Sequence, residues 1–284
     1  MRASKIVLGT AHFGMPYGIN KKEVELDDIG QILDYAKKNK INYLDTAPTY
    51  KNALEKLSTF SLKEWNIISK IPSKPKDVKD IKSWINKIFF YTLNTLKIDK
   101  IDTILIHDEN NICHKKNGDE FYKSLNDLKN QGLIRNIGCS IYIPKKLIKI
   151  LGRYKFDIIQ SPYNIFDKRI LLPEVTKILH KKKIKLHLRS IFLQGLLLRK
   201  QNIPKKFVKN KILKKFNIWL KETKSENIST CLGCISQIKF DKLVVGIDNK
   251  SQLNDIIKNV RNPSKKIPSF NVNENNIIID PRKW

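Results

Sequence analysis

The feature that most constrains the fold of this chain is a repeated alternation of two kinds of segment. Short apolar runs rich in Ile, Val and Leu are separated by longer polar segments with helical spacing. The runs cover residues 5–13, 41–47, 65–71, 102–108, 134–142, 156–164, 184–192 and 242–248. Because most of them are apolar along nearly their whole length, they are typical of parallel strands that are covered on both faces.

The segments between these runs predict helices. In residues 27–40, apolar side chains recur at intervals of three and four residues after Asp27 and Asp28, which are candidate N-terminal caps. The same spacing over 119–132 closes on Gly132, a candidate C-terminal cap. Further helices are predicted over 80–93, 144–151, 168–182, 206–221, 226–237 and 251–260.

Eight strands alternating with helices predict an α/β protein with a parallel sheet, and eight is the number that closes a (β/α)8 TIM barrel. The rival architecture is an open doubly wound sheet, which would carry GxGxxG after its first strand. Here the first strand leads into GTAHFGMPYG (9–18), which does not match. No linker rich in Gly, Pro or Ser divides the chain. We therefore expect one domain over residues 1–284, with a short C-terminal tail from about residue 262.

The formal net charge of +28 raises nucleic acids as possible partners. Arg is the residue best suited to recognise bases and to bind phosphates through two N–H groups. It occurs at only eight positions, so 47 of the 55 basic residues are Lys. Lys is spread along the chain, and its abundance with that of Ile and Asn fits an A/T-rich codon bias. We expect no specific nucleic-acid partner. The positive charge would still attract an anionic substrate to the protein by long-range electrostatics.

The sequence also bears on the compartment. No apolar run approaches the roughly 20 residues of a membrane span, and the N-terminus MRASKIVLGTAHFG lacks the apolar segment of a secretory signal. The four cysteines, Cys113, Cys139, Cys231 and Cys234, are too few for a disulfide framework and fit a reducing compartment. We therefore expect a cytoplasmic protein.

Ionisable residues end three consecutive apolar runs. The second run leads to Asp45 and then Tyr50, the third carries Lys70, and the fourth carries His107. The carboxyl ends of barrel strands meet at one rim, where the active sites of such barrels lie. We therefore expect these four side chains to converge.

The chemistry of this set is complementary. A phenol has a pKa of about 10, and a neighbouring ammonium is expected to lower it. A carboxylate keeps the ammonium charged, and an imidazole can hydrogen-bond a substrate oxygen. The set suits protonation of a carbonyl oxygen while a cofactor reduces the carbon, since no side chain supplies a hydride.

At these residues the sequence resembles the aldo/keto reductase family. The resemblance rests on ordered segments between about Lys5 and Arg261: DTAPTY (45–50), SKI (69–71), LIHD (105–108), GCSIY (138–142), IIQSPYN (158–164), RSIFLQG (189–195) and VGIDNKSQLNDI (245–256). It implies a (β/α)8 barrel that binds NADPH, with NADH as the other possibility. It also implies Tyr50 as the general acid, Lys70 and Asp45 as the groups that tune it, and His107 as the group that orients the carbonyl.

The resemblance also implies a set of cofactor-binding residues. Ser140 and Gln160 would contact the nicotinamide carboxamide, and Arg189 and Ser190 belong to the loop that covers the nicotinamide and pyrophosphate. The remaining positions are Gly9 and Thr10 in the first strand and, in the adenosine-phosphate segment, Gly246, Lys250, Gln252 and Asp255. The C-terminal IIIDPRKW (277–284) resembles members associated with surface-polysaccharide or flagellar-glycan gene sets. The substrate is thus expected to be a small aldehyde, a ketone or a keto-sugar.

The chain departs from the family pattern at several positions. After Tyr50, Lys51 replaces a Gly, Leu54 stands where a Glu is expected and Ser58 stands where a Gly often follows. Ile141 occupies the place of an Asn, which puts one carboxamide hydrogen bond in doubt. Arg189 stands where many members have an aromatic residue. Near the expected 2′-phosphate there is Lys250 but no Arg, and Asp248 does not favour a phosphate.

Other interpretations remain open from the sequence alone. The barrel could be a cofactor-binding regulatory or sensor module with little turnover. It could also be a metal-dependent hydrolase that uses His107, Asp108 and His187, although these lack paired metal-ligand spacing and we expect no metal. Cys231 and Cys234 form a CxxC pair, for which helix packing is the better explanation. Neither the substrate nor the oligomeric state follows from the sequence.

Overall fold

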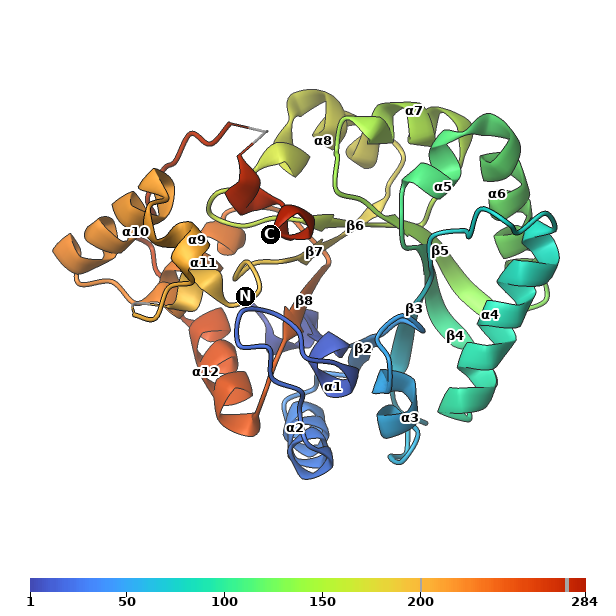
Figure 1. Cartoon of the computed structure of the whole chain (residues 1–284), viewed down its shortest axis with the longest axis horizontal. Helices are drawn as coiled ribbons and strands as arrows, with labels where there is room; N and C mark the ends of the chain where they lie inside the picture. The colour runs from blue at the N-terminus through green and yellow to red at the C-terminus, as the bar shows by residue number, and fades with distance from the viewer. Residues whose placement is uncertain (200, 274–275) are drawn as a thin grey trace.

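The structure is a computed structural model and describes residues 1–199, 201–273 and 276–284. Eight parallel strands close into a barrel surrounded by helices (Figure 1). The strands are β1 (Ile6–Gly9), β2 (Tyr43–Asp45), β3 (Asn66–Ile71), β4 (Ile101–Ile106), β5 (Ile134–Ser140), β6 (Ile158–Pro162), β7 (Lys185–Arg189) and β8 (Lys242–Gly246). Each lies inside or overlaps one of the predicted runs.

Closure of the barrel is visible in the pairing of the first strand. β1 pairs with β2, where Gly9 lies opposite Asp45, and also with β8, where Gly9 lies opposite Gly246. In an open doubly wound sheet, the first strand of the chain would not pair with the last one. The prediction of a (β/α)8 TIM barrel is confirmed.

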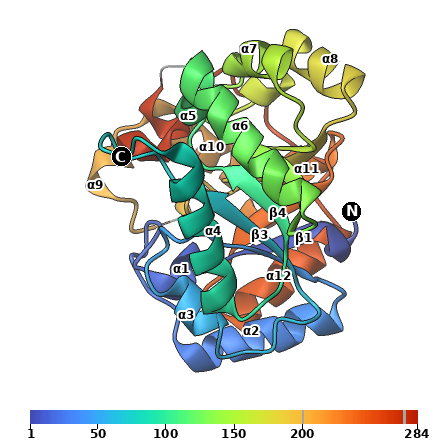
Figure 2. The same ribbon diagram turned by 90° about the vertical axis from the view of Figure 1, so that its right-hand side faces the viewer.

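Helices cover the outside of the barrel, and Figure 2 shows α4 and α6 lying side by side in front of β3 and β4. The longer helices are α2 (Leu26–Lys38), α4 (Ile81–Leu96), α6 (Lys115–Asn130), α7 (Lys146–Arg153), α8 (Pro173–Lys181), α10 (Lys211–Glu222), α11 (Asn227–Ser236) and α12 (Lys250–Arg261). Short helices are α1 (Ala11–Gly14), α3 (Ala53–Leu57), α5 (Asn110–Cys113) and α9 (Lys205–Val208).

Several predicted boundaries were wrong for local physical reasons. The helix expected over 206–221 is two helices, because Asn210 caps a new one by accepting hydrogen bonds from the backbone N–H groups of Ile212 and Leu213. Asp27 and Asp28 lie in the first turn of α2 rather than at its cap, where their charges favour the helix dipole. Gly132 follows α6 with a φ of +74°, as expected for a C-terminal glycine.

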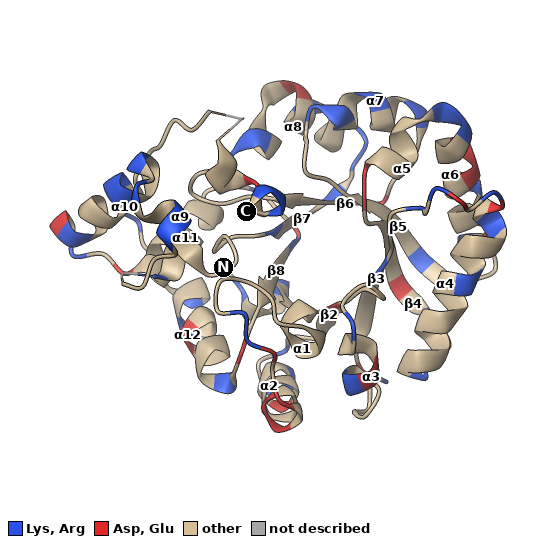
Figure 3. Cartoon of the chain, viewed as in Figure 1, with Lys and Arg blue, Asp and Glu red and all other residues tan. Residues whose placement is uncertain are grey.

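Basic side chains are distributed around the barrel. Figure 3 shows Lys and Arg on the surrounding helices on every side of this view, with Asp and Glu interspersed. In the described residues, no helix combines the length and the apolar character required to cross a membrane.

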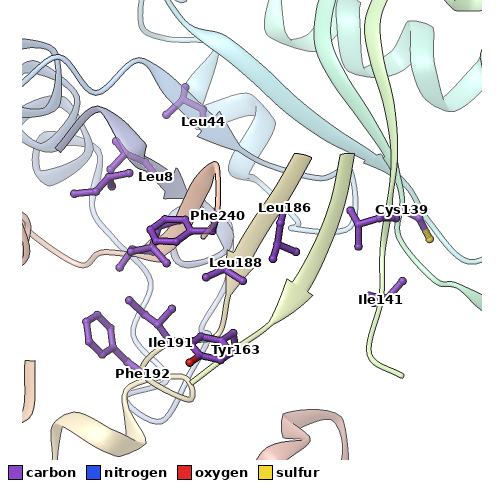
Figure 4. Packing of buried hydrophobic residues seen from close by; sticks show 14 of the residues in the cluster. Leu8, Leu44, Cys139, Ile141, Tyr163, Leu186, Leu188, Ile191, Phe192 and Phe240 are labelled. Carbon is purple, nitrogen blue, oxygen red and sulfur yellow. The ribbon is translucent and has the colours of Figure 1, made fainter. Parts of the chain in front are cut away.

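The core has two parts, as the alternation of strand side chains requires. Val7, Ile68, Leu105 and Ile158 come from four strands and form an inner cluster with almost no exposure. The opposite faces of the strands pack against the helices in a larger cluster. Figure 4 shows part of it, with Leu8, Leu44, Leu186 and Leu188 among the labelled side chains. Burying a side chain of this size contributes about 1.5–3 kcal/mol to the stability of the fold. The close packing of these side chains makes the barrel a rigid support for the carboxyl ends of its strands.

Candidate active site

A cavity of about 700 Å³ opens at the carboxyl ends of the strands. Every strand, or the residue that follows it, contributes to its lining: Gly9, Asp45, Lys70, His107, Ser140, Gln160, Arg189 and Gly246. Tyr50 reaches the same cavity from the loop after β2. The four candidate catalytic side chains are therefore brought together, as the strand-end pattern predicts.

Asp45 and Lys70 form an ion pair inside this cavity. The Lys70 Nζ lies 2.5 Å from Asp45 Oδ1 and also donates to the Thr46 carbonyl at 2.9 Å. Their side chains are only 4% and 2% exposed. Burial lowers the pKa of Lys70, while Asp45 acts in the opposite direction. An ion pair this deeply buried has a fixed geometry, because separating the charges would leave both without compensation.

Gln160 binds the second oxygen of the same carboxylate. Its Nε2 donates to Asp45 Oδ2 at 2.7 Å, so Lys70 of β3 and Gln160 of β6 hold the two oxygens of Asp45. The amide of Gln160 thus has a partner that the sequence does not predict. Its Oε1 still can accept a hydrogen bond.

Tyr50 lies between Lys70 and His107. The Lys70 Nζ is 4.9 Å from the centroid of the Tyr50 ring, and the rings of Tyr50 and His107 meet edge to face at 6.1 Å. Burial raises the pKa of Tyr50 well above its usual value, and Asp45 raises it further. The cation that acts in the opposite direction is Arg189 rather than the predicted Lys70.

His107 is neutral in this environment. Burial lowers its pKa to about 3, and the positive charges of Lys70 and Arg189 contribute in the same direction. A neutral imidazole beside a protonated phenol can hydrogen-bond an oxygen without adding a charge to the cavity.

A close backbone approach fixes the loop that carries Tyr50. A Cβ on Gly14 would lie 2.1 Å from the Tyr50 carbonyl oxygen and from the Ala53 nitrogen, so α1 and this loop touch at a position that only glycine permits. Lys51, which stands where the family has Gly, has a φ of +47°. The backbone therefore keeps a left-handed conformation at this position although the glycine is absent.

Arg189 is anchored beside the four candidate catalytic residues Asp45, Tyr50, Lys70 and His107, which form a tetrad in the cavity. One terminal nitrogen donates to the Ile141 carbonyl at 3.0 Å, and the guanidinium lies 4.0 Å from the centroid of the Tyr142 ring. Ile141 itself is fully buried and is not part of the cavity lining. The backbone carbonyl at this position, which any residue would provide, accepts from Arg189, while the buried Ile141 side chain offers nothing to a ligand in the cavity.

The other end of the cavity lies at the start of α12. Asp248 is hydrogen-bonded to the His12 ring, and Gln252 Nε2 donates to Asp248 Oδ2 at 3.3 Å. Gln252 and Asp255 line the cavity. Lys250 does not: it is exposed, with its Nζ 5.7 Å from the ring centroid of Tyr35.

The remaining expected cofactor residues, Thr10 and Ser190, also line the cavity. Sequence reasoning missed Tyr142 and Gln194, which line it as well. Tyr142 ends the segment GCSIY, so its place after Ser140 at the end of β5 was an available signal. Gln194 lies in the segment RSIFLQG, so the resemblance placed its loop at the cofactor without singling out this residue.

The other sequence features have structural explanations. Among the described residues, no three His, Cys, Asp or Glu side chains come close enough together to hold a metal ion. Asp108 accepts a hydrogen bond from Ser73, and His187 is buried in β7. Cys231 and Cys234 are buried, unbridged residues of α11, which confirms the packing interpretation.

Known proteins resemble this chain over most of its length. A sequence profile of the aldo/keto reductase family matches residues 5–265. An aldo-keto reductase of Bacillus halodurans in its holo form shares 19% identity with a TM-score of 0.73, over 92% of this chain and 88% of that one. A protein assigned as an aldo-keto reductase from Pseudomonas aeruginosa shares 18% identity with a TM-score of 0.67, over 90% and 88%. A search of curated proteins gives no match.

The two lines of comparison agree. Structural similarity at such low identity supports the barrel fold, while the sequence profile spans nearly the whole chain and includes every residue of the tetrad. The chain therefore belongs to the aldo/keto reductase family, whose members are oxidoreductases of carbonyl compounds and generally use nicotinamide cofactors.

Proposed function

We propose that this protein is an NADPH-dependent reductase that converts the carbonyl of a small aldehyde, ketone or keto-sugar to an alcohol. The observation that carries the proposal is the convergence of Asp45, Tyr50, Lys70 and His107 on one cavity. Membership of the aldo/keto reductase family supports the reaction class.

The lining of the cavity fits a nicotinamide dinucleotide. Its volume of about 700 Å³ is within the range of about 300–1,000 Å³ usual for cofactor and ligand pockets. Gly9 and Gly246 leave the wall without side chains at two facing positions of neighbouring strands. Ser140 and Gln160 offer a hydroxyl and an amide oxygen near the tetrad, which suit the carboxamide of a nicotinamide ring.

The other proposed cofactor contacts follow the length of the cavity. Thr10 and Ser190 are proposed to contact the nicotinamide half of the cofactor, and Gln252 and Asp255 its adenosine half; all four line the cavity. Lys250, exposed in the first turn of α12, is proposed to reach the 2′-phosphate of NADPH. Since Asp248 and Asp255 are close to this end, NADH is the alternative cofactor.

When bound, a reduced nicotinamide supplies the hydride that reduces the carbonyl carbon. Tyr50 then donates its proton to the carbonyl oxygen, so the product is an alcohol and Tyr50 regains a proton from water. His107, neutral, orients the oxygen by a hydrogen bond. Lys70, whose ammonium lies 4.9 Å from the centroid of the Tyr50 ring, is proposed to hold that ring in position, and Asp45 keeps Lys70 in place.

The proposal is tested by incubating the purified chain with NADPH or NADH and a panel of aldehydes, ketones and keto-sugars. We expect loss of nicotinamide absorbance with at least one carbonyl and a lower KM for NADPH than for NADH. Lys250→Ala should raise the KM for NADPH at least fivefold and leave that for NADH unchanged. Absence of turnover with every member of the panel, despite tight cofactor binding, would favour a regulatory or sensor module.

A further inference from the structure

The cavity contains a second cation besides Lys70. Arg189, at the end of β7, lines it together with Tyr50, Lys70 and His107. The positive charge of Lys70 is balanced by Asp45 at 2.5 Å. In the described parts of the chain, Arg189 has only a carbonyl, a hydroxyl and an aromatic ring as partners, and no carboxylate pairs with it. The reacting end of the cavity is therefore positively charged.

The guanidinium is held in one orientation. It donates to the Ile141 carbonyl at 3.0 Å and to Ser190 Oγ at 3.3 Å, so at least two of its five N–H groups are occupied. The Tyr142 ring on which it stacks is itself fixed. The backbone N–H of Tyr142 donates to the buried Glu109 at 3.1 Å, and Arg282 covers the ring at 3.6 Å. A ligand of Arg189 thus meets a preorganised group.

A neutral hydrogen-bond donor accompanies this charge. Tyr17 lines the same cavity, and burial raises its pKa to about 12, whereas Arg189 acts to lower it. The phenol is therefore protonated at neutral pH. Its oxygen accepts a hydrogen bond from Gln194 at 3.1 Å, which leaves its proton free for a ligand.

We propose that Arg189 and the hydroxyl of Tyr17 form an anion-binding subsite that selects carbonyl substrates bearing a carboxylate or phosphate close to the carbonyl group. The proposal rests on the reductase function proposed above. Both kinds of group match the fork of a guanidinium, and an anion there neutralises the uncompensated charge.

Binding of the cofactor phosphates is the competing role for Arg189. Arg189 contacts Ile141 and Tyr142, which directly follow Ser140 at the end of β5, so it lies at the reacting end of the cavity. Its charge accordingly acts on Tyr50, His107 and Lys70. Gln252 and Asp255 mark the other end, at α12. A group next to the tetrad is better placed for the substrate than for the adenosine phosphate.

The test compares matched carbonyls with and without an anion. The pairs are succinic semialdehyde with its methyl ester, methyl 4-oxobutanoate, and glyceraldehyde 3-phosphate with glyceraldehyde. We expect wild-type kcat/KM to favour the anionic member of at least one pair by tenfold or more, and which pair does so distinguishes carboxylate from phosphate. Arg189→Gln, which keeps an N–H for the Ile141 carbonyl, should lower kcat/KM for the anion about 10- to 100-fold. The loss for the neutral member should be smaller, so that the wild-type preference for the anion disappears in the variant.

Arg282→Gln is the matched control, since it removes an equal charge from the other face of Tyr142 without touching the cavity lining. We expect it to keep the wild-type preference. An equal loss in Arg282→Gln would assign the effect to placement of Tyr142 and overturn the proposal. A wild-type enzyme without preference for the anion, or an Arg189→Gln variant whose main defect is a raised Kd for NADPH, would also overturn it.

Binding separates failure of the subsite from failure of the reductase function. If no carbonyl is reduced, the Tm of the NADPH complex is measured with benzoate, inorganic phosphate and benzamide. A stabilisation by benzoate or phosphate that Arg189→Gln abolishes, with none by benzamide, supports the subsite without turnover. No stabilisation by either anion overturns it.

Discussion

The carboxylate of Asp45 and the ammonium of Lys70 lie 2.5 Å apart inside a closed barrel, with side chains 4% and 2% exposed. Gln160 holds the other carboxylate oxygen at 2.7 Å, and the Lys70 ammonium lies 4.9 Å from the centre of the Tyr50 ring. This chain of contacts links the position proposed for the cofactor carboxamide to the proposed acid. A change at any member is therefore expected to affect the others.

Asp45→Asn should destabilise the fold by about 3–5 kcal/mol, because it leaves the buried ammonium of Lys70 uncompensated. The double variant Asp45→Asn with Lys70→Met removes both charges and should recover most of that stability without recovering activity. Urea unfolding followed by circular dichroism measures both effects. Equal stability of the single variant and the wild type would show that the pair is not buried as described.

Reduction of a neutral aldehyde should depend little on pH between about 5 and 9. Burial raises the pKa of Tyr50 well above its usual value, so the acid keeps its proton as the pH rises. The pKa of His107 is lowered to about 3, so the imidazole stays neutral as the pH falls. The measurement is kcat/KM against pH at saturating cofactor. An inflection near pH 6.5 that disappears in His107→Asn would contradict the neutral imidazole.

Gly14→Ala should lower kcat at least tenfold and destabilise the protein by about 1–3 kcal/mol, since the added carbon would overlap the Tyr50 carbonyl and displace the acid. Gly152→Ala in α7 is the matched control. A Cβ there meets no atom within 4 Å, and the helix should gain about 0.5–1 kcal/mol. Thermal unfolding and turnover of both variants test this. Normal turnover in Gly14→Ala would mean that this contact does not position Tyr50.

Lys51→Gly should stabilise the protein by about 1 kcal/mol, because the lysine has a φ of +47° and glycine adopts such values without a steric penalty. Lys149→Gly, at an exposed position of α7, should cost about 1 kcal/mol and serves as the control. Chemical denaturation compares the two with the wild type. A loss of stability in Lys51→Gly would indicate that the lysine side chain makes a contribution larger than the strain.

Most of the fold could be predicted because the barrel repeats one local pattern. Apolar runs such as 102–108 and 242–248 identify their strands without reference to the rest of the chain. Boundaries were less accurate where a single side chain decides them, as Asn210 does when it starts α10. Helix α3 was missed because its five residues are too few to show a period.

The site was predicted to the extent that it depends on strand ends. Asp45, Lys70 and His107 were found because each interrupts an apolar run. The contacts of Arg189 could not be found in this way. They involve Ile141 and Tyr142, almost 50 residues earlier, and Arg282 in the tail, which only the folded chain brings together. Likewise, nothing in its sequence neighbourhood shows that Lys250 lies outside the cavity.

The central claim is that Tyr50 is the acid of a nicotinamide-dependent carbonyl reductase. Its most direct test is Tyr50→Phe, measured for single-turnover oxidation of bound NADPH and for NADPH binding, with Tyr43→Phe in the same barrel as the control. We predict that Tyr50→Phe reduces the carbonyl at least 1,000-fold more slowly while binding NADPH normally, and that Tyr43→Phe stays within about twofold of the wild type. Turnover by Tyr50→Phe at a rate close to that of the wild type would contradict the account.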